Sequence, residues 1–183
     1  MRNPKNYIRA DPQIIFINTM TSSQSRTEIR IRTARPDDVV AIASVVNAAF
    51  TVETFLDGTR TNDQSLKELM EKGSFLVAEN SADRIIASVY VELHGERGYF
   101  GMLAVDPETQ GIGLGRLMTE AAEQYCRNRG CREIEIKVLS LRTELPPFYQ
   151  KLGYVETGIE EFHPSRPLKT DKRCHCILMS KPL

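Results

Sequence analysis

The sequence lacks an excess of charge of either sign. Its 183 residues contain 24 Lys and Arg and 24 Asp and Glu, so the formal net charge is zero. A nucleic-acid-binding surface usually appears as a basic excess, so this balance argues against a nucleic-acid partner. The sequence also has no apolar run near the ~20 residues that a membrane-spanning helix needs. We therefore expect neither nucleic acid nor a membrane as a partner.

Signals for export, disulfides and metal binding are equally sparse. The apolar patch Ile14 to Ile17 near the N-terminus is too short for the core of a signal peptide. None of the four cysteines has a second cysteine at the CxxC spacing of structural zinc sites. Cys174 and Cys176 flank a histidine on an expected strand, where neighbouring side chains point to opposite faces. The pattern predicts reduced thiols, no metal site and a cytoplasmic location.

The spacing of apolar residues predicts one folded domain after a polar N-terminal segment. Residues 1–26 lack steady periodicity and are expected to be a flexible tail, and residues 27–183 are expected to form the domain. Apolar residues that alternate with polar ones predict strands. Apolar residues at helical spacing predict helices, whose ends are marked by acidic residues, glycine or proline. The expected strands are 28–32, 75–79, 85–94, 99–105, 133–139, 154–160 and 174–179, and the expected helices are 39–49, 63–72, 114–129 and 144–152. The element order is therefore β-α-α-β-β-β-α-β-α-β-β.

The segment Gln110 to Arg116, with the sequence QGIGLGR, is the strongest functional signal in the chain. It lies between an expected strand and an expected helix, where glycine allows a ligand to approach closely and the first helical N–H groups are unpaired. The helix dipole adds partial positive charge, so the segment suits a phosphate or pyrophosphate. A Walker-type loop is excluded because Arg116 and Leu117 stand where Lys and Ser or Thr are needed. A dinucleotide fingerprint fits poorly because the spacing is GxGxG and antiparallel hairpins precede it.

A second motif, PFYQKLGY, covers Pro147 to Tyr154. Together with LAVDPETQGIGLGRL over 103–117, it resembles the GNAT superfamily of acetyl-CoA-dependent N-acetyltransferases, which has two such motifs in this order and at this spacing. The resemblance covers about residues 28–183. It implies an α/β (α+β) fold with a mixed, mostly antiparallel sheet flanked by helices, and acetyl-CoA as co-substrate.

The resemblance also implies how the cofactor is held. The backbone of the glycine loop would bind the CoA pyrophosphate, and the main chain of the preceding strand would bind the pantetheine arm. That strand is expected to splay from its neighbour near Val138, so that the cofactor inserts between the two. Many members have an Asn before the tyrosine helix; this Asn is absent here, and either Ser140 or the main chain is expected to replace its contact. The expected cofactor-binding residues are Leu103, Ala104, Val105, Gln110, Gly111, Ile112, Gly113, Leu114, Gly115, Arg116 and Ser140.

Two residues are expected to carry the proton transfers. The resemblance places Tyr149 near the cofactor sulfur, where a phenol can protonate the leaving CoA thiolate; the alternative is that Tyr149 only packs against the sheet. An alkylamine is mostly protonated at neutral pH, so a base is also needed. Glu92 is the expected base, directly or through water, on a strand face that it shares with Ser88, Tyr90 and His94. The alternative is that this polar face is simply solvated.

The predicted reaction is acetyl transfer from acetyl-CoA to a primary amine by direct attack in a ternary complex, with a small-molecule acceptor favoured. Two alternatives stay open: a protein or peptide amine as acceptor, and a non-catalytic CoA-binding regulatory module on the same fold. The loops 50–62 and 160–173 are expected to line the acceptor site, and the chain to be a monomer or homodimer. The carboxylates that are candidates to attract a cationic amine belong to Glu53, Asp57, Glu160 and Glu161.

Overall fold

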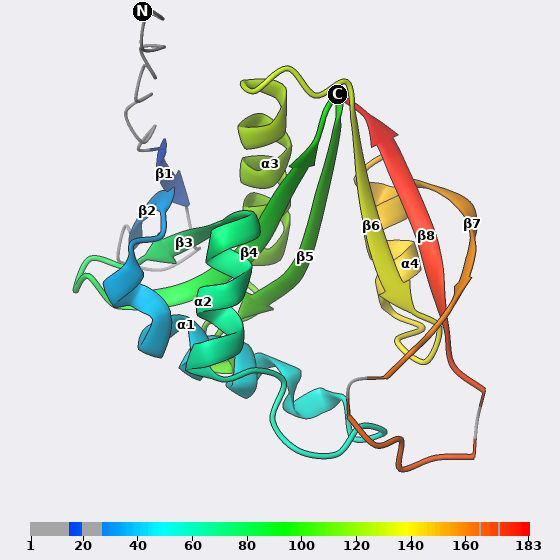
Figure 1. The fold of residues 1–183 in the computed structure, drawn as a ribbon. Coiled ribbons are helices and arrows are strands. Elements are labelled where there is room, and N and C mark those ends of the chain that lie inside the picture. The colour runs from blue at the N-terminus through cyan, green and yellow to red at the C-terminus, as the bar shows by residue number, and fades with distance from the viewer. Residues whose placement is uncertain (1–14, 20–26, 165, 172) are drawn as a thin grey trace, which may run out of the picture.

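Figure 1 shows the computed structural model of the chain, which describes residues 15–19, 27–164, 166–171 and 173–183. The described strands form one eight-stranded sheet in the order β1-β2-β3-β4-β5-β6-β8-β7. All neighbouring strands are antiparallel except β5 and β6, which are parallel. The predicted mixed, mostly antiparallel sheet is therefore confirmed. The strands are β1 (Ile15–Thr19), β2 (Thr27–Thr33), β3 (Ser74–Glu79), β4 (Ile85–His94), β5 (Arg97–Val105), β6 (Glu133–Leu139), β7 (Val155–Glu161) and β8 (His175–Pro182).

Helices cover both faces of the sheet. α1 (Val39–Ala49) and α2 (Asp63–Lys72) lie on one face of β3 to β5, and α3 (Leu114–Arg127) lies on the other (Figure 1). α4 (Leu145–Lys151) joins the hydrophobic cluster of β6 and β8 through Tyr149. No helix in the described part of the chain is long and apolar enough to cross a membrane.

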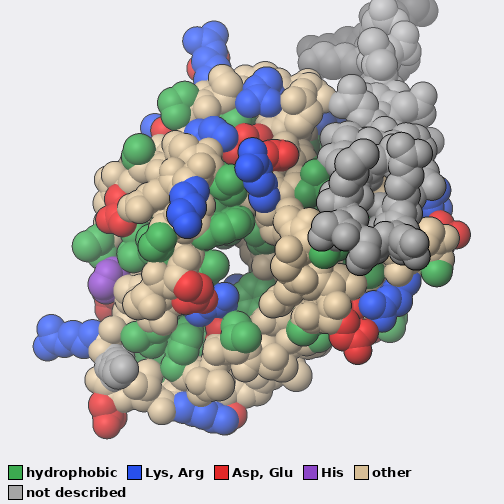
Figure 2. Space-filling model, turned by 180° about the vertical axis from the view of Figure 1, so that it is seen from behind, with side chains coloured by type: hydrophobic (Ala, Val, Ile, Leu, Met, Phe, Trp, Pro, Cys, Tyr) green, Lys and Arg blue, Asp and Glu red, His purple; other side chains and the backbone are tan. Residues whose placement is uncertain are grey.

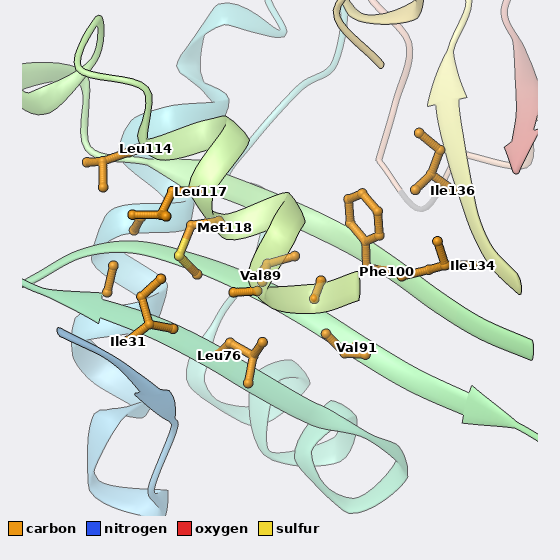
Figure 3. Close-up of a cluster of buried hydrophobic side chains, with 14 of the residues drawn as sticks. Ile31, Leu76, Val89, Val91, Phe100, Leu114, Leu117, Met118, Ile134 and Ile136 are labelled. Carbon is orange, nitrogen blue, oxygen red and sulfur yellow. The ribbon is translucent and has the colours of Figure 1, made fainter. Parts of the chain in front are cut away.

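Each face of the sheet has its own hydrophobic cluster. On the α3 face, Leu114, Leu117 and Met118 point from the helix toward the sheet, where Val89 and Phe100 are buried (Figure 3). The other cluster joins α1 and α2 to the opposite face, and its largest fully buried members include Ile42, Leu66 and Phe75. These clusters fix where β5 and the start of α3 lie, and both elements border the site described below.

The parallel pair β5 and β6 separates soon after it forms. The two strands pair only over Arg97–Tyr99 and Glu133–Glu135. Beyond these residues they diverge, and the sheet opens into two halves, β1 to β5 on one side and β6, β8 and β7 on the other (Figure 1). The splay expected from the family resemblance is present, and it begins before Val138.

β5 also contains a bulge at the point where it leaves β6. Its register with β4 shifts between Ser88 and Tyr90, because Ser88 pairs with Ala104 and Tyr90 with Gly101. The extra residue lies at Met102 or Leu103, and Met102 has a φ of 49°, in the left-handed region that side chains rarely adopt. A bulge bends its strand and increases the twist, so it directs the second half of β5 away from β6.

Most predicted elements are confirmed, and two strands (β4, β6) and two helices (α1, α2) have the expected bounds. The sequence interpretation missed β1, which pairs with β2 inside the segment expected to be a tail. Its sequence, IFINT, does not alternate between apolar and polar residues, and its ladder with β2 stabilises it. The other residues of the expected tail lie outside the described residues.

The polar face of β4 is not simply solvated, because Ser88 and Tyr90 are buried under α1 and α2.

A network of ion pairs joins β2, β3 and the start of α1. The buried Glu79 carboxylate accepts hydrogen bonds from Arg30 Nε at 2.9 Å and from Arg32 Nε at 2.8 Å. Arg32 also donates to both oxygens of Asp38, at 2.7 and 3.0 Å. The hydrogen bonds from Arg32 lower the pKa of Asp38; for Glu79, burial alone would raise the pKa, but the two arginines together lower it. Both carboxylates therefore stabilise the fold in their charged form.

We predict that Glu79→Gln lowers the free energy of unfolding by about 3 kcal/mol at pH 7, because two guanidinium groups lose their buried counter-charge. Urea unfolding would measure this loss, with Glu71→Gln on the exposed face of α2 as the control. Because the folded-state pKa is lowered, the stabilisation is complete above the ordinary pKa values of 4.5 (Glu79) and 3.8 (Asp38) and is lost as the pH falls below them. A difference between the wild type and Glu79→Gln that stays constant down to pH 3 would contradict this account.

Candidate active site

The splay between β5 and β6 opens into a cavity of about 730 Å³. Figure 2, seen from behind, shows the opening between the two halves of the molecule. The walls come from the inner edges of both strands, the glycine loop, α4, and the loops that follow α1 and β7. One cavity therefore brings together the two sequence motifs and the two loops that were expected to form the site.

The facing edges of β5 and β6 present backbone groups to this cavity. Strand pairing stops at Tyr99 and Glu135, and Leu103, Val105 and Val138 all line the space beyond. Backbone N–H and C=O groups need hydrogen-bond partners, and an open strand edge can pair with an extended ligand. The cavity is thus suited to a ligand arm that binds along β5 through main-chain hydrogen bonds.

The glycine loop forms the end of the cavity beyond β5. α3 begins at Leu114, and Gly113 directly before it has a φ of 86°, as does Gly111. A residue with a side chain would be strained by about 1–2 kcal/mol in this left-handed conformation. The turn therefore places the unpaired N–H groups at the start of α3 along the cavity wall, and the exposed Arg116 follows one residue after Gly115.

Eight of the eleven expected cofactor-binding residues line the cavity, and Ala104, Ile112 and Ser140 do not. Ala104 is buried in the cluster under α1, and Ile112 packs against the cluster of α3. The Ser140 hydroxyl accepts a hydrogen bond from the backbone N–H of His175 at 3.1 Å, so it joins β6 to the start of β8. A role in binding for these three would have to come through the backbone or a rearrangement.

Tyr149 lies in the cavity wall on α4. Its ring is buried among Phe100, Phe148 and Tyr154, with ring centroids at 5.9, 5.0 and 5.6 Å. Its hydroxyl makes no hydrogen bond with any described residue. Burial raises the pKa of Tyr149 well above its usual range, and Arg142 opposes this shift only in part. The phenol is therefore neutral at physiological pH and has a proton to donate.

Glu92 lies outside the cavity wall. Its carboxylate accepts a hydrogen bond from the Tyr90 hydroxyl at 3.0 Å and lies 3.4 Å from His94 Nε2. Its cross-strand partner Tyr99 does line the cavity, and the Tyr99 ring lies over Gly101, where a Cβ would be 2.5 Å from the Tyr99 hydroxyl. Glu92 therefore borders the cavity from behind Tyr99, and a proton from the cavity would reach it through water or this phenol.

Glu53 is buried in the cavity wall, with its side chain only 4% exposed. Arg142 donates to one of its oxygens and Arg166 to the other, both at 3.2 Å. Two other carboxylates that were expected to attract an amine also have cationic partners: Asp57 pairs with Lys169, and Glu160 pairs with Lys137. The part of the cavity lined by the loops after α1 and β7 is thus richer in cations than the sequence interpretation expected.

The two loops at this end of the cavity are joined to each other. Leu56 and Leu168 form an isolated β-bridge. The backbone N–H of Asp57 donates to Pro167 O, and that of Lys169 donates to Phe55 O, both at 2.9 Å. The loop after α1 and the loop before β8 meet in this way in Figure 1, and residues of both line the cavity.

Thiols and metal ligands contribute little to this site. All four cysteines are free, and Cys176 is the one in the cavity wall. Burial raises the pKa of the Cys176 thiol, and the charge of Glu160 adds to the shift. In the part of the chain that the structure describes, no three His, Cys, Asp or Glu side chains are grouped to hold a metal ion.

A sheet that splays at its parallel pair, with a glycine turn and a helix start at the opening, is the architecture of an acetyltransferase fold. The profile of the Acetyltransferase (GNAT) domain family matches residues 33–163. The chain therefore belongs to the GNAT family, and the superfamily expected from its two motifs, that of the N-acetyltransferases, is confirmed.

Similar proteins agree with this assignment. The mycothiol acetyltransferase of Saccharopolyspora erythraea is 30% identical over 121 residues, which cover 64% of this chain and 40% of that protein. That of Renibacterium salmoninarum is 30% identical over 139 residues, covering 70% of this chain and 41% of that protein. The ribosomal-protein-S18-alanine N-acetyltransferase structure from Escherichia coli has a TM-score of 0.68 at 20% identity, covering 84% of this chain and 93% of that chain. The chain spans less than half the length of the mycothiol acetyltransferases that it matches.

Proposed function

We propose that this chain binds acetyl-CoA in the cavity and transfers the acetyl group directly to a primary amine of a small molecule. The observation that carries the proposal is that one cavity joins an open strand edge, a glycine turn at a helix start and an unpaired phenol. The first two suit the pantetheine arm and the pyrophosphate of CoA, and the third suits its thiolate. Family membership supports the choice of acetyl-CoA as the acyl donor.

In this proposal the cavity binds CoA along the glycine loop and β5 and places the thioester beside Tyr149. The N–H groups at the start of α3 bind the pyrophosphate, and the edge of β5 at Leu103 and Val105 binds the pantetheine arm. The amine nitrogen attacks the thioester carbon, a C–N bond forms, and the C–S bond breaks with its electron pair on sulfur. Tyr149 donates its proton to that sulfur, and the high pKa of Tyr149 keeps the proton available. Glu92, directly or through water, accepts the proton that the ammonium group loses before attack, and the second proton, lost from the new amide nitrogen, restores the Tyr149 phenol.

The state of Cys176 supports direct attack by the amine. A covalent acetyl-enzyme would need a thiolate, because the thiolate is the nucleophilic form of cysteine. Cys176 lines the cavity, but its raised pKa holds the thiol neutral. The amine itself is then the nucleophile, in a complex that holds both substrates.

The tied loops favour a small acceptor. A protein substrate would need an open groove for an extended segment, whereas the Leu56–Leu168 bridge and the Glu53–Arg166 ion pair close this end of the cavity. The curated relatives are named for mycothiol, a small molecule, while the Escherichia coli neighbour is named for a ribosomal protein. An acceptor screen by CoA release, with polyamines, amino acids, aminoglycosides and peptides, would decide between the two classes.

Glycine at position 113 is predicted to be needed for cofactor binding. Gly113→Ala should raise the Kd for acetyl-CoA about tenfold, because alanine resists the left-handed turn by roughly 1–2 kcal/mol and turns the helix-start N–H groups away. Gly130→Ala is the matched control, since Gly130 has a φ of 87° but lies outside the cavity wall. Both variants should lose similar stability, and calorimetry should show weaker binding only in Gly113→Ala. Equal Kd values for the two variants would remove the loop from the site.

Tyr149→Phe is predicted to lower kcat about 100-fold, because the leaving thiolate loses its proton donor. The Kd for acetyl-CoA should stay unchanged, since the ring and its packing are retained. Tyr125→Phe serves as the control, because the Tyr125 hydroxyl bonds to Ser74 outside the cavity wall. If kcat is unaffected in Tyr149→Phe, another group protonates the thiolate.

Glu92→Gln is predicted to lower kcat at neutral pH, because the amine loses its proton acceptor behind Tyr99. The exposed Glu96→Gln on the neighbouring turn is the control. A kcat of Glu92→Gln equal to that of the wild type would exclude Glu92 as the base.

A further inference from the structure

Arg60 is placed in the cavity wall without a polar partner. It lies between α1 and α2, and its guanidinium carbon is 5.1 Å from the centroid of the Phe50 ring. Its Nε is buried and has no hydrogen-bond partner among the described residues. Leaving a buried charged donor unpaired costs free energy that a protein normally avoids, so a ligand that supplies the missing acceptor would be favoured.

The other cations at this end of the cavity are already neutralised. Lys137 pairs with Glu160, Arg142 with Glu144 and Glu53, and Arg166 with Glu53. Arg60 forms no ion pair with any described residue, and burial lowers its pKa, an effect that the charge of Glu53 only partly offsets. Glu53 is fully engaged with two other arginines, so one unit of positive charge remains unbalanced at Arg60.

We propose that the acceptor amine carries a carboxylate and that Arg60 binds this carboxylate in the acceptor end of the cavity. The inference rests on the proposed function and names the substrate class of the same site. The guanidinium presents a planar fork of N–H donors that matches the two oxygens of a carboxylate. The bound carboxylate would complete the hydrogen bonds of Arg60 and balance its charge.

The phosphates of CoA are not the ligand of Arg60. The glycine loop precedes α3 on one face of the sheet, whereas Arg60 lies against the Phe50 ring, which packs with the cluster of α1 and α2 on the other face. The proposed pantetheine path along the edge of β5 lies between the two. Arg116 lies at the phosphate end and is distinct from this cluster.

The single unbalanced charge also favours a carboxylate over a phosphate. A phosphate monoester carries about −1.5 to −2 charges at pH 7 and needs several donors for its three free oxygens. The remaining cations here are committed to buried or neighbouring carboxylates. A singly charged, two-oxygen group is the better match to one free guanidinium.

The first test compares matched acceptors in steady-state kinetics. The carboxylate series compares each of four amino acids with its carboxamide and with the amine that lacks the carboxyl group: alanine, glutamate, phenylalanine and lysine. A phosphate pair compares aminoethyl phosphate with ethanolamine. The wild type should favour carboxylates over carboxamides at least tenfold in kcat/KM. Arg60→Met should abolish this preference and leave the Kd for acetyl-CoA unchanged, and Arg60→Lys should retain part of it. Arg127→Met, on the exposed end of α3, should behave as the wild type.

The second test observes Arg60 directly and does not depend on turnover. In the protein measured both with and without CoA, the NMR signal of the Arg60 Nε–H, identified by its loss in Arg60→Lys, should shift with the N-acetylated acids and not with their carboxamides. If amines are acetylated with no preference for a carboxylate, or with a preference for aminoethyl phosphate, the inference is overturned. The proposed function still holds in that case. If acetyl-CoA fails to bind or no amine is acetylated, the proposed function fails. The Arg60 signal then still decides the carboxylate site: a shift supports it, and no shift overturns it.

Discussion

The separation of β5 from β6 is the constraint on which the rest of the site depends. Two parallel strands that begin as a hydrogen-bonded pair would normally stay paired along their length, because buried backbone groups without a hydrogen bond cost free energy. Here an aromatic cluster lies at the point of separation, where Phe100 of β5 contacts both Tyr149 and Tyr154. These rings fill the space that continued pairing would close. The aromatic core therefore supports the separation of the two strands.

The aromatic cluster is itself fixed by a buried polar network. The Tyr154 hydroxyl donates to Glu123 of α3 at 3.0 Å, and Lys181 of β8 donates to both oxygens of that carboxylate at 2.9 Å. One carboxylate thus connects α3, the segment after α4, and β8. Because α3 begins at the glycine loop and Tyr154 follows the helix of Tyr149, this network relates the two ends of the proposed CoA site to each other.

The cofactor end of the cavity could be predicted from sequence because its chemistry is local. A glycine turn, a helix start and a strand edge follow one another within 103–117, and their geometry is set by backbone conformations that glycine allows. Tyr149 was singled out only through the family resemblance of the motif at 147–154. The splay was expected only through the family resemblance, because no residue pattern states where a ladder ends. β1 was missed since a five-residue strand depends on its neighbour.

The acceptor end could not be predicted because its residues meet only in the folded chain. Glu53 contacts Arg142 and Arg166, which are 89 and 113 positions away, and no spacing rule connects such residues. Taken singly, Glu53 looks like a surface carboxylate that attracts amines. In the structure it serves as the counter-charge of two arginines, which leaves Arg60 as the unbalanced group. The unbalanced charge at this end of the cavity is therefore opposite in sign to the one that the sequence suggested. The sign of this charge is set by the ion pairs that form in the folded chain. Those ion pairs depend on how the loops after α1 and β7 are joined across the cavity.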